Sequence, residues 1–236
     1  MKRAVILAGG LGTRLRPYTV AIPKPLMPLG QYPILEIIIR QLRNAGFGHV
    51  TLAVNHQADL FRAFFGDGSK WGVRIDYSLE TKPLSTMGPL RLIPDLPEHF
   101  LVMNGDILSD VPYGDFLEAH AVADRLFTIS ASRRVQRIDY GVLQIDAEQC
   151  LSGFEEKPVI PFLVSMGIYA VSRRVLDSIP PDQAFGFDHL VLSYLDSGQS
   201  VATVVHEGYW LDIGRPEDYE RANNEWPEFS RQVGVE

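Results

Sequence analysis

Short apolar runs rich in β-branched residues alternate along this chain with longer amphipathic segments, and this alternation restricts the fold more than any other feature. Apolar residues recur at helical spacing between Ile34 and Ala45, which predicts a helix closed by Gly46. Further helices are predicted over 59–65 and 115–123, each with an aspartate at its start. The predicted strands cover 3–8, 50–54, 73–77, 100–103, 126–131, 141–145, 164–171 and 201–205. Such alternation predicts an α/β fold of βαβ units, with helices on both faces of a mostly parallel sheet.

No repeat or linker divides the 236 residues, so we expect one domain over residues 1–236. It has an N-terminal half of about residues 1–110 and a C-terminal half of about residues 111–236 that closes over it. The net charge of −7 and the lack of a basic block argue against nucleic acid as a partner. The lone Cys150 cannot form an internal disulfide, and no apolar run is long enough to span a bilayer. We therefore expect a cytoplasmic protein without a membrane partner.

A glycine-rich loop follows the first predicted strand directly. Gly9, Gly10 and Gly12 leave the backbone N–H groups accessible, and a loop of this kind can hold phosphate. Thr13 adds a hydroxyl, and Arg14 adds a cation that can donate two parallel hydrogen bonds to phosphate oxygens. The spacing matches neither the G-x-x-x-x-G-K-[ST] loop nor the G-x-G-x-x-G dinucleotide motif, so a redox fold is disfavoured.

Two further polar features accompany this loop. Pro23 and Pro25 hold Lys24 in an extended segment, which limits the freedom of its ammonium group. Asp106 ends the stretch FLVMNGD, where an isolated aspartate would be interpreted as a helix cap. Residues 9–14, residues 104–106 and a predicted loop before 164–171 all border predicted strands. Ligands of such sheets bind at the carboxyl ends of the strands, which predicts one shared site.

The stretch LAGGLGTRLRPYT…IPKPLMPLG closely resembles the opening motif of sugar-1-phosphate nucleotidyltransferases, the nucleotide-sugar pyrophosphorylases. The resemblance continues, in the order of that family, through ETKPLSTMGPL, LVMNGDI, GFEEKP, VSMGIYAVS and GYWLDIGRPEDYERAN. It implies a single Rossmann-like α/β/α domain of three layers with a mostly parallel mixed sheet, the GT-A-like nucleotidyltransferase fold. It also implies that the N-terminal half binds nucleotide and the C-terminal half binds sugar phosphate.

The resemblance implies a reaction as well. In that family, the phosphate of a sugar-1-phosphate attacks the α-phosphorus of a nucleoside triphosphate, and pyrophosphate leaves. The implied catalytic residues are Arg14 on the leaving pyrophosphate, Lys24 on the α-phosphate or sugar phosphate, and Asp106. Asp106 and Asp212 are the implied ligands of Mg²⁺, a hard cation that prefers oxygen.

The remaining implied residues bind the two substrates. The block GFEEKP supplies Glu156 and Lys157 to the sugar phosphate, and the same pocket takes Tyr140, Gly141, Ser165 and Tyr169. The implied nucleotide-binding residues are Leu7, Ala8, Gly9, Gly10, Gly12, Thr13, Glu80, Pro83, Leu84, Ser85, Thr86, Gly88, Asn104 and Gly105. Ser85 and Met87 depart from the Leu-Gly-Thr-Ala-Gly of the family, and the missing glycine removes backbone freedom where the base binds.

The sequence is most similar to the guanylyltransferase branch, which handles mannose-1-phosphate and related heptose phosphates, so GTP is the favoured nucleotide. Uridylyl, thymidylyl or cytidylyl transfer to another sugar or to an alcohol phosphate stays open, as does a homodimer. A metal-dependent glycosyltransferase is disfavoured because Asp106 and Asp110 do not form a D-x-D pair. A non-catalytic nucleotide-sugar sensor is the alternative from another class, and the retained Arg14 and Lys24 argue against it. His56, His99 and His120 are interpreted as structural or solvated.

Overall fold

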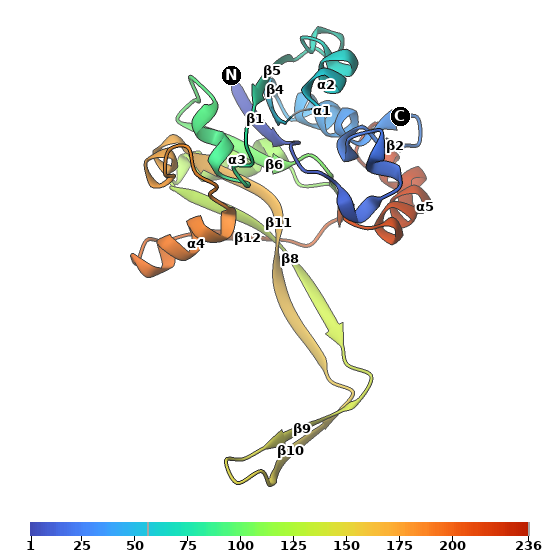
Figure 1. The fold of residues 1–236 in the computed structure, drawn as a ribbon, viewed down its shortest axis with the longest axis vertical. Coiled ribbons are helices and arrows are strands. Elements are labelled where there is room, and N and C mark those ends of the chain that lie inside the picture. The colour runs from blue at the N-terminus through green and yellow to red at the C-terminus, as the bar shows by residue number, and fades with distance from the viewer. Residues whose placement is uncertain (56, 236) are drawn as a thin grey trace.

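A seven-stranded sheet forms the centre of the computed structural model, which describes residues 1–55 and 57–235. The strand order is β12-β8-β11-β6-β1-β4-β5 (Figure 1). These strands are β1 (Lys2–Leu7), β4 (Phe47–Val54), β5 (Arg74–Leu79), β6 (His99–Asn104), β8 (Phe127–Arg137), β11 (Val159–Ser172) and β12 (Ala202–His206). Only β11 runs antiparallel to its neighbours, β6 and β8. The prediction of an α/β fold with a mostly parallel mixed sheet is confirmed. His56 lies outside the described residues.

The helices are α1 (Ile34–Asn44), α2 (Ala58–Phe65), α3 (Tyr113–Val122), α4 (Phe187–Asp196) and α5 (Pro216–Gln232). The first three match predicted helices, whereas α4 and α5 were not predicted. Neither aspartate at a predicted helix start is a cap, because Gln57 and Pro112 hold the cap positions. Asp59 and Asp115 lie in the first turn, where a carboxylate favours the positive end of the helix dipole. No helix of the described residues is both long enough and apolar enough to cross a bilayer.

Side chains of the sheet alternate between two apolar cores, one on each face. In β1, Ala4 and Ile6 belong to one core while Val5 belongs to the other. The first core takes its helical residues from α1, α2, α3 and α5, and the second takes them from α4. The sheet is therefore the middle of three layers. Strands buried on both faces need continuous apolar runs, and runs of that kind made the sheet predictable.

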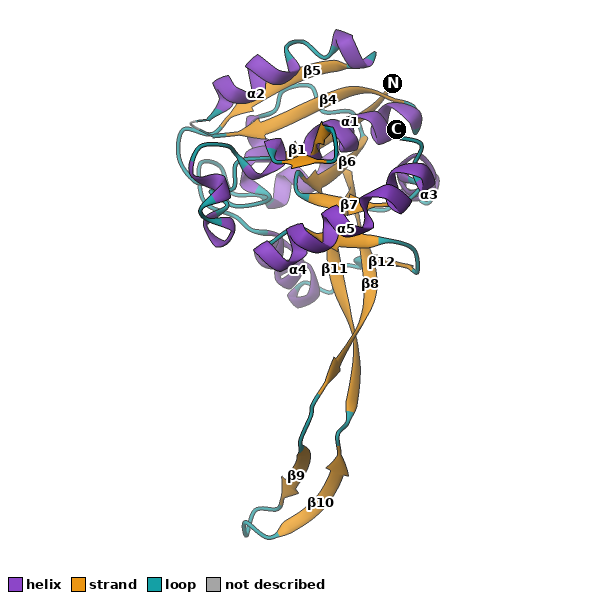
Figure 2. Ribbon diagram, turned by 90° about the vertical axis from the view of Figure 1, so that its right-hand side faces the viewer, coloured by secondary structure: helices purple, strands orange, loops and turns teal. Residues whose placement is uncertain are grey.

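Beyond the sheet, β8 and β11 continue as an antiparallel ribbon up to the pair Arg137–Val159. Two further strands, β9 (Gly141–Ile145) and β10 (Leu151–Glu156), pair with each other at its far end. Figures 1 and 2 show this ribbon and hairpin projecting away from the rest of the molecule. We refer to residues 133–163 as the arm. The predicted loop before residue 164 is wrong, because residues 159–163 are ladder-paired strand.

Two small sheets complete the fold. The pair β2 (Pro28–Leu29) and β3 (Tyr32–Pro33) precedes α1, and β7 (Ile107–Ser109) pairs antiparallel with β13 (Trp210–Asp212). Asp212 lies opposite Ile107 in this second pair, and the Ile213 amide donates to the Asp106 carbonyl at 3.1 Å. A segment late in the chain is thereby held beside the end of β6.

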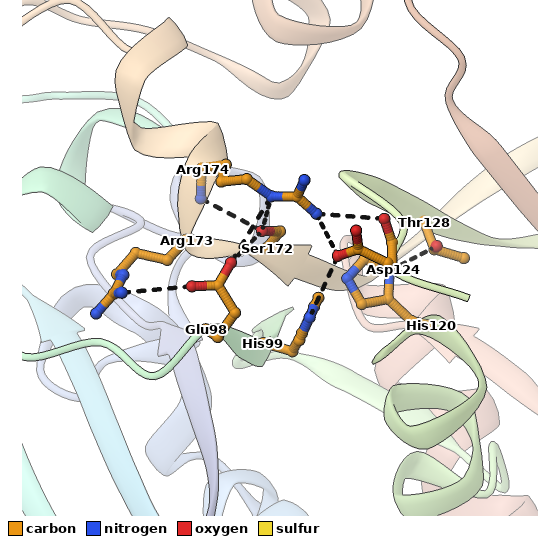
Figure 3. Close-up of polar contacts among 8 residues, drawn as sticks. All are labelled: Glu98, His99, His120, Asp124, Thr128, Ser172, Arg173 and Arg174. Carbon is orange, nitrogen blue, oxygen red and sulfur yellow. Dashed lines mark hydrogen bonds and ion pairs between the residues drawn. The ribbon is translucent and has the colours of Figure 1, made fainter. Parts of the chain in front are cut away.

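At the opposite end of β6, a polar network joins four neighbouring elements (Figure 3). His99 begins the strand, and its ring meets the His120 ring edge-on at 5.1 Å between centroids. His120 is buried, shares one hydrogen bond with Thr128 at 2.8 Å, and lies close enough to Arg174 and Asp124 for their charges to act on it. Burial, and then the nearby His99 charge, lowers the pKa of His120 to about 4. His120 is therefore a neutral packing residue at neutral pH.

Candidate active site

A cavity of about 650 Å³ opens at the carboxyl ends of β1, β4 and β6. Open α/β sheets bind their ligands at this edge. The lining residues come from several stretches of the chain that lie far apart in sequence. They are residues 7–14, Lys24, Pro25, Asn55, residues 80–83, Ser85, Thr86, Asn104, Asp106 and Gly214.

The glycine-rich loop forms one wall and is held from both sides. Gly12 has φ +59°, a left-handed conformation that glycine adopts without a Cβ penalty, and its carbonyl accepts from the Thr19 hydroxyl at 2.7 Å. The Asn55 amide donates to the Gly9 carbonyl. A Cβ at position 9 would lie 2.8 Å from the Glu80 carboxylate, so a side chain there would force that carboxylate to shift. These contacts hold the loop in place, so that its backbone borders the cavity without side chains over it.

Glu80 and the following residues form the facing wall. The Leu84 amide donates to the Glu80 carboxylate at 3.0 Å, while burial raises the pKa of Glu80. Ser85 has φ +64°, the conformation that glycine would adopt most easily. The departure from glycine noted in the sequence therefore falls where the backbone is left-handed, and the chain accepts a strained serine at the cavity wall.

Charged groups gather on the floor of the cavity. Lys24 forms an ion pair with Asp106, and both side chains are mostly buried. Burial, followed by the negative charge of Asp106, raises the pKa of Asp212, while Lys24 and Arg14 act against that rise. Arg14 is close enough that its guanidinium would lie 3.5 Å from a Cβ at Gly214. The predicted cations and carboxylates thus lie on one side of the molecule.

The two carboxylates fit a hard divalent cation. Such an ion takes carboxylate oxygens and keeps several waters, so two aspartates suffice. Burial first, and then the charge of Asp106, raises the pKa of Asp212, and a cation beside the two carboxylates would neutralise their charge. Within residues 1–55 and 57–235, no group of three or more His, Cys, Asp or Glu side chains gathers as a metal cage. Asp106 and Asp212 are consequently suited to an ion shared with a ligand.

The cavity brings together most of the predicted catalytic and nucleotide-binding residues. Arg14, Lys24 and Asp106 all line it. The predicted residues that do not line it are the nucleotide-binding residues Leu84, Gly88 and Gly105 and the metal ligand Asp212, whereas Gly214, two residues after Asp212, does line it. The lining residues that sequence reasoning missed are Leu11, Pro25, Asn55, Thr81, Lys82 and Gly214. Asn55 follows the predicted strand 50–54, so the rule applied to Asp106 could have found it.

The predicted sugar-site residues are not assembled around this cavity. Tyr140, Gly141, Glu156 and Lys157 lie on the exposed arm (Figure 2). Ser165 and Tyr169 lie in β11, where their hydroxyl groups are hydrogen-bonded at 3.1 Å.

Tyr169 belongs to the core of the sheet. Its ring stacks between Phe127 and Phe187, with centroids at 5.4 and 4.8 Å, and burial raises its pKa to about 12. A role for these six residues in substrate binding stays a prediction.

A sequence model of the family described as nucleotidyl transferase matches residues 3–228. The chain belongs to this family. Its relatives include a probable mannose-1-phosphate guanylyltransferase 1 of Oryza sativa subsp. japonica, 34% identical over 92% of this chain. A mannose-1-phosphate guanyltransferase of Schizosaccharomyces pombe is 33% identical over the same share. This nucleotidyl transferase chain spans 62% of the length of each of those two relatives.

Solved structures of similar fold cover nearly the whole nucleotidyl transferase chain. HddC from Yersinia pseudotuberculosis, complexed with GMP-PN, has a TM-score of 0.71 and 28% identity. That match covers 96% of this chain and 100% of HddC. A putative glucose-1-phosphate thymidylyltransferase from Bacillus anthracis has a TM-score of 0.77 over 99% of both chains. Its 23% identity supports the shared fold alone.

Proposed function

We propose that this nucleotidyl transferase joins a nucleoside triphosphate, with GTP favoured, to a mannose- or heptose-type sugar-1-phosphate. The products are a nucleotide-sugar and pyrophosphate. The observation that carries the proposal is the convergence of Arg14, Lys24 and Asp106 beside a glycine-rich loop in one cavity, with Asp212 close enough to interact with the charges of all three. The names of the guanylyltransferase relatives and the GMP-PN ligand of HddC support the choice of guanine and of this sugar class.

The chemistry asks mainly for positioning and charge neutralisation. An oxygen of the sugar phosphate, already an anion, forms a bond to the α-phosphorus, and the bond from that phosphorus to the oxygen that bridges the α- and β-phosphates breaks, so that this oxygen leaves with pyrophosphate. No general base is needed, so the protein must hold two polyanions in line. Arg14 and the amides of residues 10–13 bind the leaving pyrophosphate, and Lys24 binds the α-phosphate or the incoming phosphate. Preorganised donors of this kind act most strongly on charge that develops in the transition state.

Asp106 and Asp212 are the residues that would hold Mg²⁺. When bound, the ion supplies positive charge to the phosphate oxygens. The base and ribose take the wall formed by Glu80 and residues 84–88, and Glu156 and Lys157 serve the sugar phosphate. In this proposal the N-terminal half, about residues 1–110, binds the nucleotide and the remainder binds the sugar phosphate.

The proposal is tested with purified protein, MgCl₂ and a panel of sugar-1-phosphates. Pyrophosphate release is measured with GTP, UTP, dTTP, CTP and ATP. GTP with mannose- or heptose-1-phosphate should give the highest turnover, and Asp106→Asn should lose most of it. Turnover confined to a pyrimidine triphosphate rejects the guanylyl assignment. Tight nucleotide-sugar binding without pyrophosphate release from any pair rejects the enzyme and favours a sensor.

A further inference from the structure

The hairpin at the end of the arm has one apolar face that is left uncovered by the described part of the chain, residues 1–55 and 57–235. Leu143 pairs with Phe154 and Ile145 pairs with Leu151, so these four side chains share a face of the two strands. Each of them is 61–64% exposed. Glu156 lies on the same face, since its carboxylate and the Phe154 ring both approach the position of a Cβ on Gly141. The face therefore combines an apolar stripe with a carboxylate.

A hairpin of this kind needs a covering surface. Two isolated antiparallel strands are marginally stable in water and are stabilised by packing against another element. Contiguous exposed apolar side chains on a protein surface mark a contact site. The charge of the hairpin region indicates what kind of surface can cover it. Residues 139–157 contain one cation, Lys157, and five acidic residues, which are Asp139, Asp146, Glu148, Glu155 and Glu156. The cover should be apolar and basic.

The segment at the rim of the cavity is both apolar and basic. Leu11 lines the cavity, and Tyr18, Val20 and Ile22 lie in the stretch between Arg14 and Lys24, which both line it; all four are large apolar residues and are exposed. Arg14 and Arg16 lie among them, and the first acidic residue of the whole chain is Glu36. The rim segment, residues 11–22, is thus complementary to the hairpin both in apolar surface and in charge.

The hairpin does not lie on the rim of its own chain. The ladder between β8 and β11 continues to Arg137–Val159, and the Ile138 amide still donates to the Pro158 carbonyl at 3.1 Å. This ribbon carries the hairpin away from the sheet and the cavity (Figures 1 and 2). Every chain therefore offers one arm and one uncovered rim, and a twofold pair of chains can satisfy both at once.

We propose that a second copy of this chain receives the arm, and that two copies exchange arms. The apolar face of each hairpin packs on the rim segment of the other copy. Glu156 and Lys157 then reach the other copy's cavity, where they bind the sugar phosphate beside Arg14 and Lys24. The exchange explains how residues on a projecting arm can serve a site that their own chain leaves open. The roles of Glu156 and Lys157 rest on the proposed function, whereas the exchange of arms does not.

Complementation distinguishes exchange from an arm that folds back on its own chain. One variant carries Arg14→Ala in the body, and the other carries Glu156→Ala with Lys157→Ala in the arm. Each homodimer should lose most of its turnover. In an exchanged mixed dimer, one site combines an intact body with an intact arm, so turnover should return to roughly half that of the wild type. A mixed dimer as inactive as its parents overturns the exchange. Arg14→Ala mixed with Lys24→Ala is the control and should stay inactive.

A second measurement needs no activity. Cys150 is the single cysteine of the chain and lies exposed at the hairpin turn, where it can carry a maleimide photo-crosslinker. Unlabelled and ¹⁵N-labelled full-length chains are mixed, irradiated and digested. Cross-linked peptides that pair the two isotopes support exchange, and peptides of one isotope only overturn it. Mixed-isotope products together with an absence of transferase activity would reject the proposed function and leave the exchange standing.

Light scattering on full-length variants tests the face that makes the contact. Phe154→Lys places a charge in the apolar stripe and should convert a dimer to a monomer at micromolar concentration. Gln144→Lys adds the same charge to the opposite face of the hairpin, because successive residues of a strand alternate between faces, and should stay dimeric. A monomeric wild type, or equal effects of the two substitutions, overturns the proposal.

Discussion

Lys24 and Asp106 form an ion pair on the floor of the cavity although 82 positions separate them in the chain. The proline-flanked segment supplies the ammonium, and the end of β6 supplies the carboxylate. Asp212 lies close enough to Asp106 for their charges to interact. Lys24 consequently compensates two carboxylates and remains near the position where substrate phosphate would lie.

Replacing Lys24 by alanine should reduce kcat by about 100- to 1,000-fold, the usual cost of losing one preorganised donor to a developing charge. The KM for nucleotide should change less, because Arg14 and the glycine-rich loop remain. Pyrophosphate release under saturating substrate measures the effect. Lys70→Ala removes an exposed lysine over Trp71 and serves as the control. Similar kcat values for both variants would contradict the proposed role.

Asp212→Asn should weaken divalent-ion binding by about 10- to 100-fold, a range seen when even indirect metal contacts are lost. The physical reason is that one of two oxygen donors loses its charge. Binding of Mn²⁺, followed by electron paramagnetic resonance on the protein without substrate, gives a readout apart from activity. Asp218 lies nearby, and its carboxylate accepts hydrogen bonds from the Gly214 and Arg215 amides. The variant Asp218→Asn therefore controls for a general loss of negative charge. Equal affinities would remove Asp212 from the site.

Gly9→Ala should lower the free energy of unfolding by about 1 kcal/mol, because the added methyl displaces the Glu80 carboxylate from its contact with the Leu84 amide. Gly10→Ala is the matched control, since a Cβ there meets nothing within 4 Å. Urea denaturation followed by circular dichroism compares the two. The steric explanation fails if both glycines tolerate alanine equally.

Ser85→Gly should raise the free energy of unfolding by about 1 kcal/mol, since a non-glycine residue at φ +64° carries left-handed strain. Ser85→Ala keeps the strain and removes the hydroxyl, so it should bring no gain. Thermal denaturation of both variants checks the prediction. A more stable alanine variant would point to the hydroxyl instead of the backbone.

Stability should fall with decreasing pH partly through His120. Its pKa in the folded protein is about 4, below the ordinary value of 6.5, so the unfolded chain binds the extra proton first. This contribution, about 3 kcal/mol at most, is fully present above pH 6.5 and is lost as pH falls towards 4. His120→Gln removes the titrating group. Unfolding in urea at several pH values should therefore show a shallower decline for the variant, and parallel curves would contradict it.

The sheet and the side of the cavity formed by the glycine-rich loop could be predicted because their signals are local. Apolar runs mark strands, and a strand followed by Gly9 or Asp106 marks the carboxyl edge. The contact between Glu80 and Gly9 could not be predicted, because it joins two loops that follow different strands and depends on a fit of tenths of an ångström. The place of Tyr169 in the core could not be predicted for a different reason. In a strand buried on both faces, the sequence pattern does not show which aromatic side chains belong to the core.

The projecting arm could not be predicted from sequence patterns, for a further reason. The strand over 141–145 was predicted correctly, but its partner over 151–156 mixes apolar and acidic residues without clear alternation. Nothing in either segment says whether a hairpin folds over its own sheet or projects from it. That outcome depends on how far the β8–β11 ladder continues. The length of the ladder is set by the two strands together and not by either sequence segment alone.

The pairing of β7 with β13 has a consequence for the order in which the protein acquires its capabilities during synthesis. Asp212 is held beside Asp106 by that short antiparallel pair and by the hydrogen bond from the Ile213 amide to the Asp106 carbonyl. While the ribosome is still translating codon 211, the emerging polypeptide already contains the glycine loop, Lys24 and Asp106. Asp212, the second proposed metal ligand, does not yet exist. Under the proposed function, the growing chain therefore contains its phosphate-facing loop well before it contains both metal ligands.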